Sequence, residues 1–164
     1  MPINWTDFLS ESNKIKLESG NLDSEFTYVG IDFGTSTTVV SIAFIDENRD
    51  LVVNHVPLKQ RMYSGSYYTD HRINSCIALI NKKVLIGKGA KEEAPYLKKD
   101  INYWASFKME LGVDKGCAYP NSMLDSSQKV IIENPKDATR IFFTKIKGLI
   151  NDYLIKKDLS RSVK

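Results

Sequence analysis

The sequence predicts an α/β protein in which a three-stranded antiparallel β-meander carries one long helix. Three apolar runs, within residues 28–31, 39–45 and 51–56, follow one another through short links. Strands with such short links pair antiparallel, because a parallel pair needs a longer crossover. Residues 134–156 then carry the clearest helical pattern in the chain. We therefore expect the helix to pack on one face of the meander.

The long helix has start signals as well as periodicity. Asn134 can cap it, Pro135 suits the first helical position, and Asp137 lies in the first turn, where a carboxylate favours the helix dipole. Apolar side chains then recur every three or four residues. They are Ala138, Ile141, Phe142, Ile146, Leu149, Ile150, Tyr153 and Leu154.

Between the third strand and the long helix we expect an inserted α+β subdomain. Its expected parts are a Tyr-rich surface loop over 58–72, a hairpin over 75–80 and 84–86, a helix over 88–94 stopped by Pro95, and a helix over 99–111. The predicted division of the chain is an N-terminal extension and linker (1–26), a core (27–58 and 129–158), the inserted subdomain (59–128) and a tail (159–164).

The composition argues against several classes of function. A net charge of +3 from scattered residues does not favour nucleic-acid binding, and no apolar run reaches the length of a membrane span. The two cysteines and two histidines lack ligand or triad spacing, so zinc sites and nucleophilic triads are not expected. We interpret the cysteines as reduced thiols of a cytoplasmic protein.

One stretch, residues 28–41, carries the candidate chemistry. It predicts a strand that ends at Asp32, a tight turn over 33–36, and a second strand. Gly34 permits a positive φ or a close approach to the main chain. Backbone amides and the hydroxyls at positions 35–38 could bind an anion, and Asp32 could hold a hard divalent cation. The alternative is an ordinary glycine-containing hairpin turn.

The stretch Gly30-Ile-Asp-Phe-Gly-Thr-Ser36 resembles the first phosphate-binding hairpin of the actin-like ATPase superfamily, most closely the heat-shock-seventy (DnaK-type) chaperones. The resemblance implies an RNase-H-like first lobe that binds the phosphates of Mg²⁺–ATP or Mg²⁺–ADP. It implies that Asp32 positions Mg²⁺ through its water shell. It also implies that Gly34, Thr35, Ser36 and Thr37 cradle the β- and γ-phosphates.

Two later runs resemble the same chaperones. Leu85-Ile-Gly87 and Ala90-Lys91 match a strand pair and the helix after it, and Phe107-Lys-Met-Glu-Leu-Gly112 matches the segment of the catalytic lysine. On that register Lys108 stabilises the transferring phosphoryl group, although it could equally be one more solvated helix lysine. Three residues depart from the family pattern: Ser75 replaces proline, Lys88 replaces aspartate, and Met109 replaces arginine.

The resemblance covers about residues 27–158, which is only the first part of such an ATPase. In the family a strand follows the long helix, and a second acidic residue, a second phosphate loop and the adenosine pocket come later, on a second lobe. We therefore expect an ATP-binding half-site with weak or no ATPase activity alone, as part of a longer protein or a naturally short relative. Co-chaperones or clients would bind other parts of a full-length protein. The alternatives are a sugar-kinase lobe and a non-catalytic interaction module.

Overall fold

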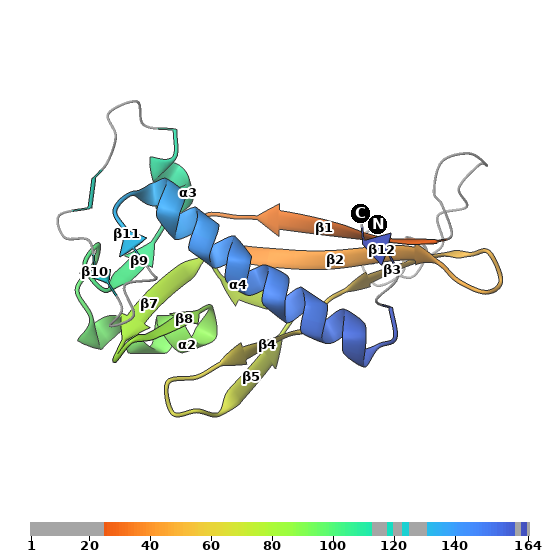
Figure 1. Cartoon of the computed structure of the whole chain (residues 1–164), viewed down its shortest axis with the longest axis horizontal. Helices are drawn as coiled ribbons and strands as arrows, with labels where there is room; N and C mark the ends of the chain where they lie inside the picture. The colour runs from red at the N-terminus through yellow and green to blue at the C-terminus, as the bar shows by residue number, and fades with distance from the viewer. Residues whose placement is uncertain (1–24, 113–117, 120–122, 125–130, 160–161, 164) are drawn as a thin grey trace, which may run out of the picture.

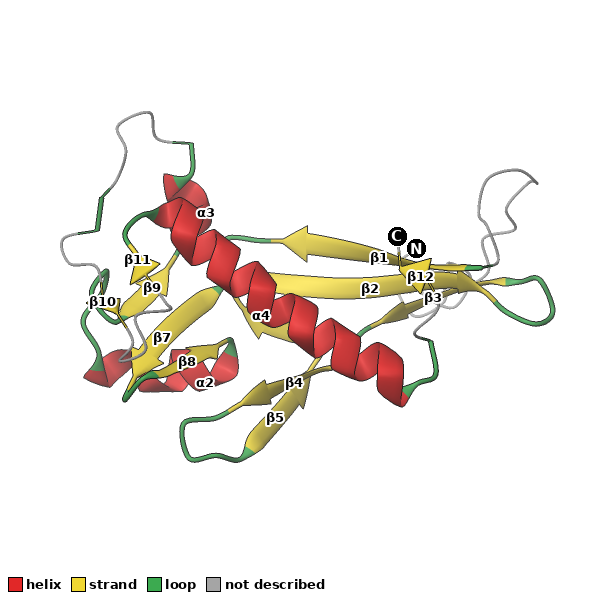
Figure 2. Ribbon diagram, in the orientation of Figure 1, coloured by secondary structure: helices red, strands yellow, loops and turns green. Residues whose placement is uncertain are grey.

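The computed structural model describes residues 25–112, 118–119, 123–124, 131–159 and 162–163, and it is a mixed α/β arrangement of antiparallel sheets with few helices (Figure 2). The predicted N-terminal extension lies outside these residues, except for Glu25 and for Phe26, the first residue of β1. The described helices are α2 (Lys88–Glu93), α3 (Phe107–Glu110) and α4 (Pro135–Lys156), with a 3₁₀ turn at Ala94–Tyr96. None of them combines the length and the apolar character that a membrane crossing requires.

The central sheet confirms the predicted meander. Strands β1 (Phe26–Phe33), β2 (Thr37–Ile45) and β3 (Leu51–His55) pair antiparallel in that order. Two further strands join them. β6 (Arg72–Asn74) pairs antiparallel with the start of β2, and β12 (Ser162–Val163) pairs parallel with β1. Residues 162 and 163 of the predicted tail thus form a strand at the edge of this sheet (Figure 1).

Smaller sheets complete the fold. One three-stranded sheet has the order β8-β7-β9, one hairpin joins β4 to β5, and another antiparallel pair joins β10 to β11. Their bounds are Leu58–Arg61 (β4), Tyr67–Asp70 (β5), Cys76–Ile80 (β7), Lys83–Ile86 (β8), Tyr103–Ala105 (β9), Met123–Leu124 (β10) and Ile131–Ile132 (β11). The predicted hairpin over 75–80 and 84–86 is thus confirmed as β7–β8.

Helix α4 packs across one face of the central sheet, as predicted. Phe142 and Ile146 are fully buried and share a hydrophobic core with Val40 and Ile42 of β2. The same core includes Trp104 from the inserted region. Burial of apolar area contributes about 25 cal/mol per Å², so this shared core holds the sheet, the helix and the insertion together.

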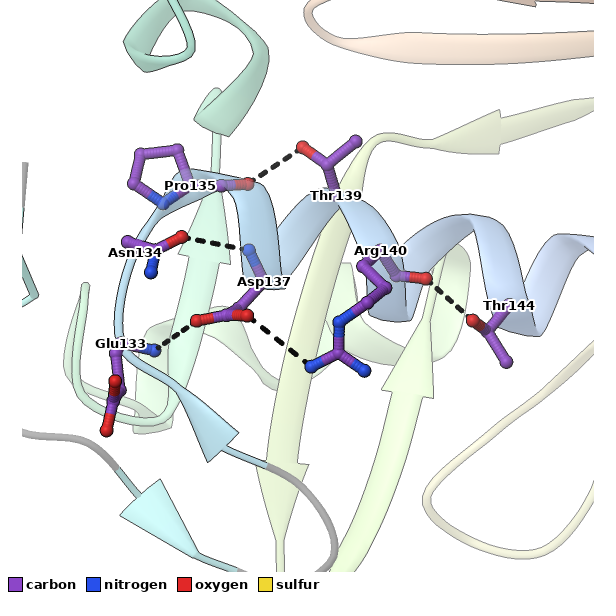
Figure 3. Close-up of polar contacts among 7 residues, drawn as sticks. All are labelled: Glu133, Asn134, Pro135, Asp137, Thr139, Arg140 and Thr144. Carbon is purple, nitrogen blue, oxygen red and sulfur yellow. Dashed lines mark hydrogen bonds and ion pairs between the residues drawn. The ribbon is translucent and has the colours of Figure 1, made fainter. Parts of the chain in front are cut away.

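The start of α4 has the predicted cap. The Asn134 side chain accepts a hydrogen bond from the Asp137 amide at 3.0 Å, and the Asp137 carboxylate accepts from the Glu133 amide at 3.3 Å (Figure 3). Arg140 forms an ion pair with Asp137 at 3.4 Å, one turn further on. The Asn134 cap satisfies an amide donor that the first helical turn would otherwise leave unpaired, and the Glu133 bond fixes the chain just before the helix.

We expect Asn134→Ala to lower the free energy of unfolding by about 1 kcal/mol, because it removes this cap. Urea denaturation followed by circular dichroism measures the change. Asn151→Ala, an exposed position inside the same helix, is the control and should not destabilise the protein. Equal losses from both variants would contradict the capping role.

The expected surface loop over 58–72 is wrong, because this segment is mostly the β4–β5 hairpin. Leu58 and Gln60 point into the protein and are buried, while their neighbours are exposed. Gln60 can be buried although it is polar, because both the nitrogen and the oxygen of its side-chain amide form hydrogen bonds. Its amide donates to the Arg72 carbonyl at 3.2 Å, and its oxygen accepts from the Lys88 amide at 2.7 Å.

The expected helix over 99–111 is also wrong. Residues 103–105 form β9 against β7, and only Phe107–Glu110 is helical. Asp100 and Ser106 both adopt positive φ values, 59° and 62°, which interrupt any continuous helix. Leu111, expected on the buried face, is 39% exposed.

Candidate functional site

The turn between β1 and β2 is a tight one that requires glycine. The Gly34 amide donates to the Thr37 carbonyl at 3.0 Å. A Cβ on Gly34 would lie 2.4 Å from that same carbonyl oxygen, closer than real Cβ contacts occur. Gly34 is therefore needed for the close approach of two backbone segments. The other expected reason, a positive φ, does not apply, because the described glycines with positive φ are Gly65 and Gly87.

We expect Gly34→Ala to cost about 1–3 kcal/mol, because the backbone of the turn must move to admit the methyl group. Thermal or urea unfolding checks this result. The matched control is Gly112→Ala, where nothing lies within 4 Å of the added Cβ. If both variants unfold at the same denaturant concentration as the parent, the turn is not as tightly closed as the structure has it.

Several donors of the turn have no partner within the described part of the chain. The Thr35 and Ser36 amides donate no hydrogen bond to described residues, and neither do the hydroxyls of Thr35, Ser36 and Thr37. Ser36 and Thr37 are exposed and Thr35 is half-buried. Two adjacent free amides beside three hydroxyls form a concentrated set of donors, which is the chemistry that an anion such as phosphate requires.

Thr38 does not belong to this set, although its hydroxyl was expected among the donors. Its side chain is fully buried and its hydroxyl lies 2.9 Å from the Ser75 hydroxyl. Ser75 also donates its hydroxyl to the Gly34 carbonyl at 2.8 Å and its amide to the Ser36 carbonyl at 2.9 Å. Ser75 therefore braces the turn from behind, a role that sequence reasoning missed.

Lys108 lies at this turn, although 75 residues separate it from Phe33 in the sequence. Its ammonium group donates a hydrogen bond to the Phe33 carbonyl and lies 5.5 Å from the centre of the Phe33 ring. An ammonium group has three donors, so this bond leaves two for another acceptor. The side chain of Lys108 is exposed, and a ligand at the turn could reach it.

An aromatic cluster sets the position of Lys108. The neighbouring Phe107 is buried, and its ring centre lies 6.0 Å from that of Phe33 and 5.6 Å from that of Phe142. Phe33 also contacts Phe143 edge-on at 5.0 Å. The end of β1, helix α3 and helix α4 therefore meet in one aromatic cluster. Because Phe107 is fixed in this cluster, Lys108, the next residue, lies at the end of β1.

Asp32 lies one residue before Phe33 on β1, opposite Val39. Its carboxylate is exposed and forms no hydrogen bond or ion pair with the described residues. Those residues contain no group of three or more His, Cys, Asp or Glu side chains that could hold a metal. A single exposed carboxylate suits Mg²⁺, which keeps several waters and takes one or two protein carboxylates together with phosphate oxygens.

The described histidines and cysteine, the other side chains that could act in catalysis, do not contribute to this turn. His55 contacts the Ser41 hydroxyl at 3.0 Å, and its ring lies 6.4 Å from that of His71. Cys76 is a free thiol, and burial raises its pKa, which disfavours the reactive thiolate. Cys117 lies outside the described residues.

The structure thus brings Gly34, Thr35, Ser36, Thr37 and Lys108 to one turn, and Asp32 to the strand that enters it. Comparison with protein-family models gives no match for this chain, and comparison with curated proteins gives none either.

Proposed function

We propose that the chain is the phosphate-binding lobe of an actin-like ATPase, similar to the first lobe of DnaK-type chaperones, with an RNase-H-like core. The ligand is Mg²⁺–ATP or Mg²⁺–ADP. The observation that carries the proposal is the contact between Lys108 and the β1–β2 turn. The resemblance implies that both segments belong to one phosphate site, and their contact supports that implication.

The topology also supports the RNase-H-like core. A meander is followed by a long helix, and the chain then returns as β12, parallel to β1 on the side opposite β2. The family likewise has a strand after its long helix. The strand order β12-β1-β2-β3 agrees with such a core, and an ordinary three-stranded hairpin sheet would not include β12.

Each residue has a defined role under this proposal. The amides of Thr35 and Ser36 and the nearby hydroxyls donate to phosphate oxygens, and Gly34 keeps the turn tight enough to present them. Lys108 places its remaining donors beside the terminal phosphate, where they stabilise negative charge. Asp32 holds the hydrated metal. Mg²⁺ supplies charge neutralisation to the bound phosphates when it is present.

The described residues form one wall of such a site, so bound phosphates would remain partly solvated. Electrostatic attraction weakens strongly in contact with water, and affinity falls accordingly. We therefore expect millimolar-range binding of nucleotide and little or no hydrolysis by this chain alone. Fast turnover by the purified chain would contradict the half-site part of the proposal.

Isothermal titration calorimetry with Mg²⁺–ATP tests the function. We expect Lys108→Ala to weaken binding about three- to tenfold, because one charge-assisted contact to phosphate is lost. Lys147→Ala removes an exposed lysine elsewhere, on α4, with the same change in net charge. Equal weakening by both variants would indicate non-specific attraction. No binding by a folded chain would instead favour a non-catalytic interaction module.

A further inference from the structure

A hollow lies away from the β1–β2 turn, between the β4–β5 hairpin, strand β8 and the C-terminal half of α4. Its volume is about 760 Å³. In Figure 1 the β4–β5 hairpin lies beneath the late turns of α4, whereas α3, which carries Lys108, lies at the first turns of that helix. None of the residues assigned above to phosphate binding lines this hollow. It is therefore a separate candidate site.

The rim of the hollow is strongly basic. Five cationic side chains line it, together with the single carboxylate of Asp152. The ion pairs within the described part of the chain involve Lys88, Lys99 and Arg140, so none of the five cations is neutralised by one. All five are exposed, and they come from β4 and from α4 with the C-cap residue that follows it. They are Lys59, Arg61, Lys145, Lys156 and Lys157.

Beneath this rim the hollow is apolar. Val84, Leu149 and Tyr153 are only partly buried, although they pack against the main core. Tyr67 stands on the other side and is 57% exposed, with the Lys59 ammonium 4.2 Å from its ring centre. Incompletely covered apolar and aromatic surface beside unpaired cations is the usual composition of a site for a small ligand.

We propose that this hollow binds a small organic anion, with an aromatic or similarly flat apolar body in contact with Leu149, Tyr153 and Tyr67, and one acidic group at the basic rim. The volume lies within the range of pockets that enclose small molecules, about 300–1,000 Å³. Facing cations from β4 and α4 raise the local concentration of anions between them. The apolar surface below the rim favours anions that also carry an apolar group, because burial of that group contributes to binding.

Chemical-shift mapping by NMR with naphthalene-2-sulfonate tests this inference in the full chain. The amides of β4, β8 and the C-terminal half of α4 should shift in a saturable manner, and those of residues 34–37 should not. Two further probes test the apolar surface and the basic rim separately. Uncharged 2-naphthol and inorganic sulfate should each bind at least about tenfold more weakly than the combined probe, because each lacks one element.

Two matched variants test the basic rim. Lys145→Gln removes a cation that lines the hollow, while Lys147→Gln removes an exposed cation of the same helix that does not line it. We expect about a three- to tenfold loss of affinity for naphthalene-2-sulfonate from the first and none from the second. Lys156→Gln gives a second test in case Lys145→Gln disturbs the helix.

Four outcomes would overturn the inference. One is the absence of saturable shifts at millimolar probe, and another is equal weakening by Lys145→Gln and Lys147→Gln. The third is a short glutamate-rich peptide that shifts the same amides while naphthalene-2-sulfonate does not, which would assign the surface to an acidic protein partner. Shifts confined to residues 34–37 would overturn it too, and would leave the phosphate site as the binding place.

Discussion

Phe142→Ala should lower the free energy of unfolding by about 3–5 kcal/mol, the range for truncation of a buried phenylalanine. Phe142 is fully buried, and its ring lies 5.9 Å from Phe33 and 5.6 Å from Phe107, measured between ring centres. The substitution would therefore open a cavity where β1, α3 and α4 meet. Native domains are stable by only about 5–15 kcal/mol, so this is a large share of the total.

Urea denaturation at several temperatures measures the loss. The control on the same helix is Ile155→Ala, because Ile155 is 68% exposed and its truncation should change stability by less than about 0.5 kcal/mol. Since Phe107 holds the segment that carries Lys108, any Phe142→Ala protein that remains folded should also bind Mg²⁺–ATP less tightly. A loss below about 1 kcal/mol would show that the aromatic cluster does not organise this end of the fold.

Asp32→Asn should abolish most of the dependence of ATP binding on Mg²⁺. The side chain keeps its size but loses the charge that a hydrated cation requires, so we expect the affinity for ATP in Mg²⁺ to fall about tenfold or more. Stability should be nearly unchanged, because the carboxylate is exposed and contacts no described residue through a hydrogen bond or ion pair.

The measurement compares ATP titrations with Mg²⁺ and with a chelator, for the parent chain and the variant. Asp50→Asn, at an exposed carboxylate before β3, is the control for the change in net charge. If the two variants respond to Mg²⁺ alike, Asp32 has no role in metal binding and the phosphate site must be assigned without it.

The parts of the fold that sequence predicted are those in which local signals and tertiary structure agree. The meander had short links, and α4 had a cap, a proline at its first position and a nearly unbroken apolar stripe. The position of Lys108 was predicted only through resemblance to known ATPases. No periodicity in the chain could have placed it beside Phe33, because that contact depends on how Phe107 packs in three dimensions.

The failures have specific physical causes. Gln60 has a polar side chain that is buried only because the Lys88 amide and the Arg72 carbonyl satisfy it, so the β4 strand showed no apolar alternation. Trp104 and Phe107 are three residues apart and both buried, which imitates a helix. The positive φ of Ser106 between them separates a strand from a short helix instead.

Ser75 was missed for a related reason. Ser75 stands where the chaperones that this stretch resembles have proline, and from the sequence it is only a departure from their pattern. Its hydrogen bonds to Gly34 and Ser36 cross 41 and 39 residues of sequence, and no local signal reports them. The buried pair of hydroxyls at Ser75 and Thr38 explains why polar residues occur at the back of this turn.

The most direct test of the central claim is an amide-resolved NMR titration of the chain with Mg²⁺–ATP. The account predicts that the largest saturable shifts occur at Thr35 and Ser36, whose amides are free to donate to phosphate, and that Lys108→Ala reduces them. Shifts that leave Thr35 and Ser36 unchanged and instead gather along β4 and the C-terminal half of α4 would contradict it. Nucleotide would then bind the basic hollow, and the β1–β2 turn would be an ordinary hairpin.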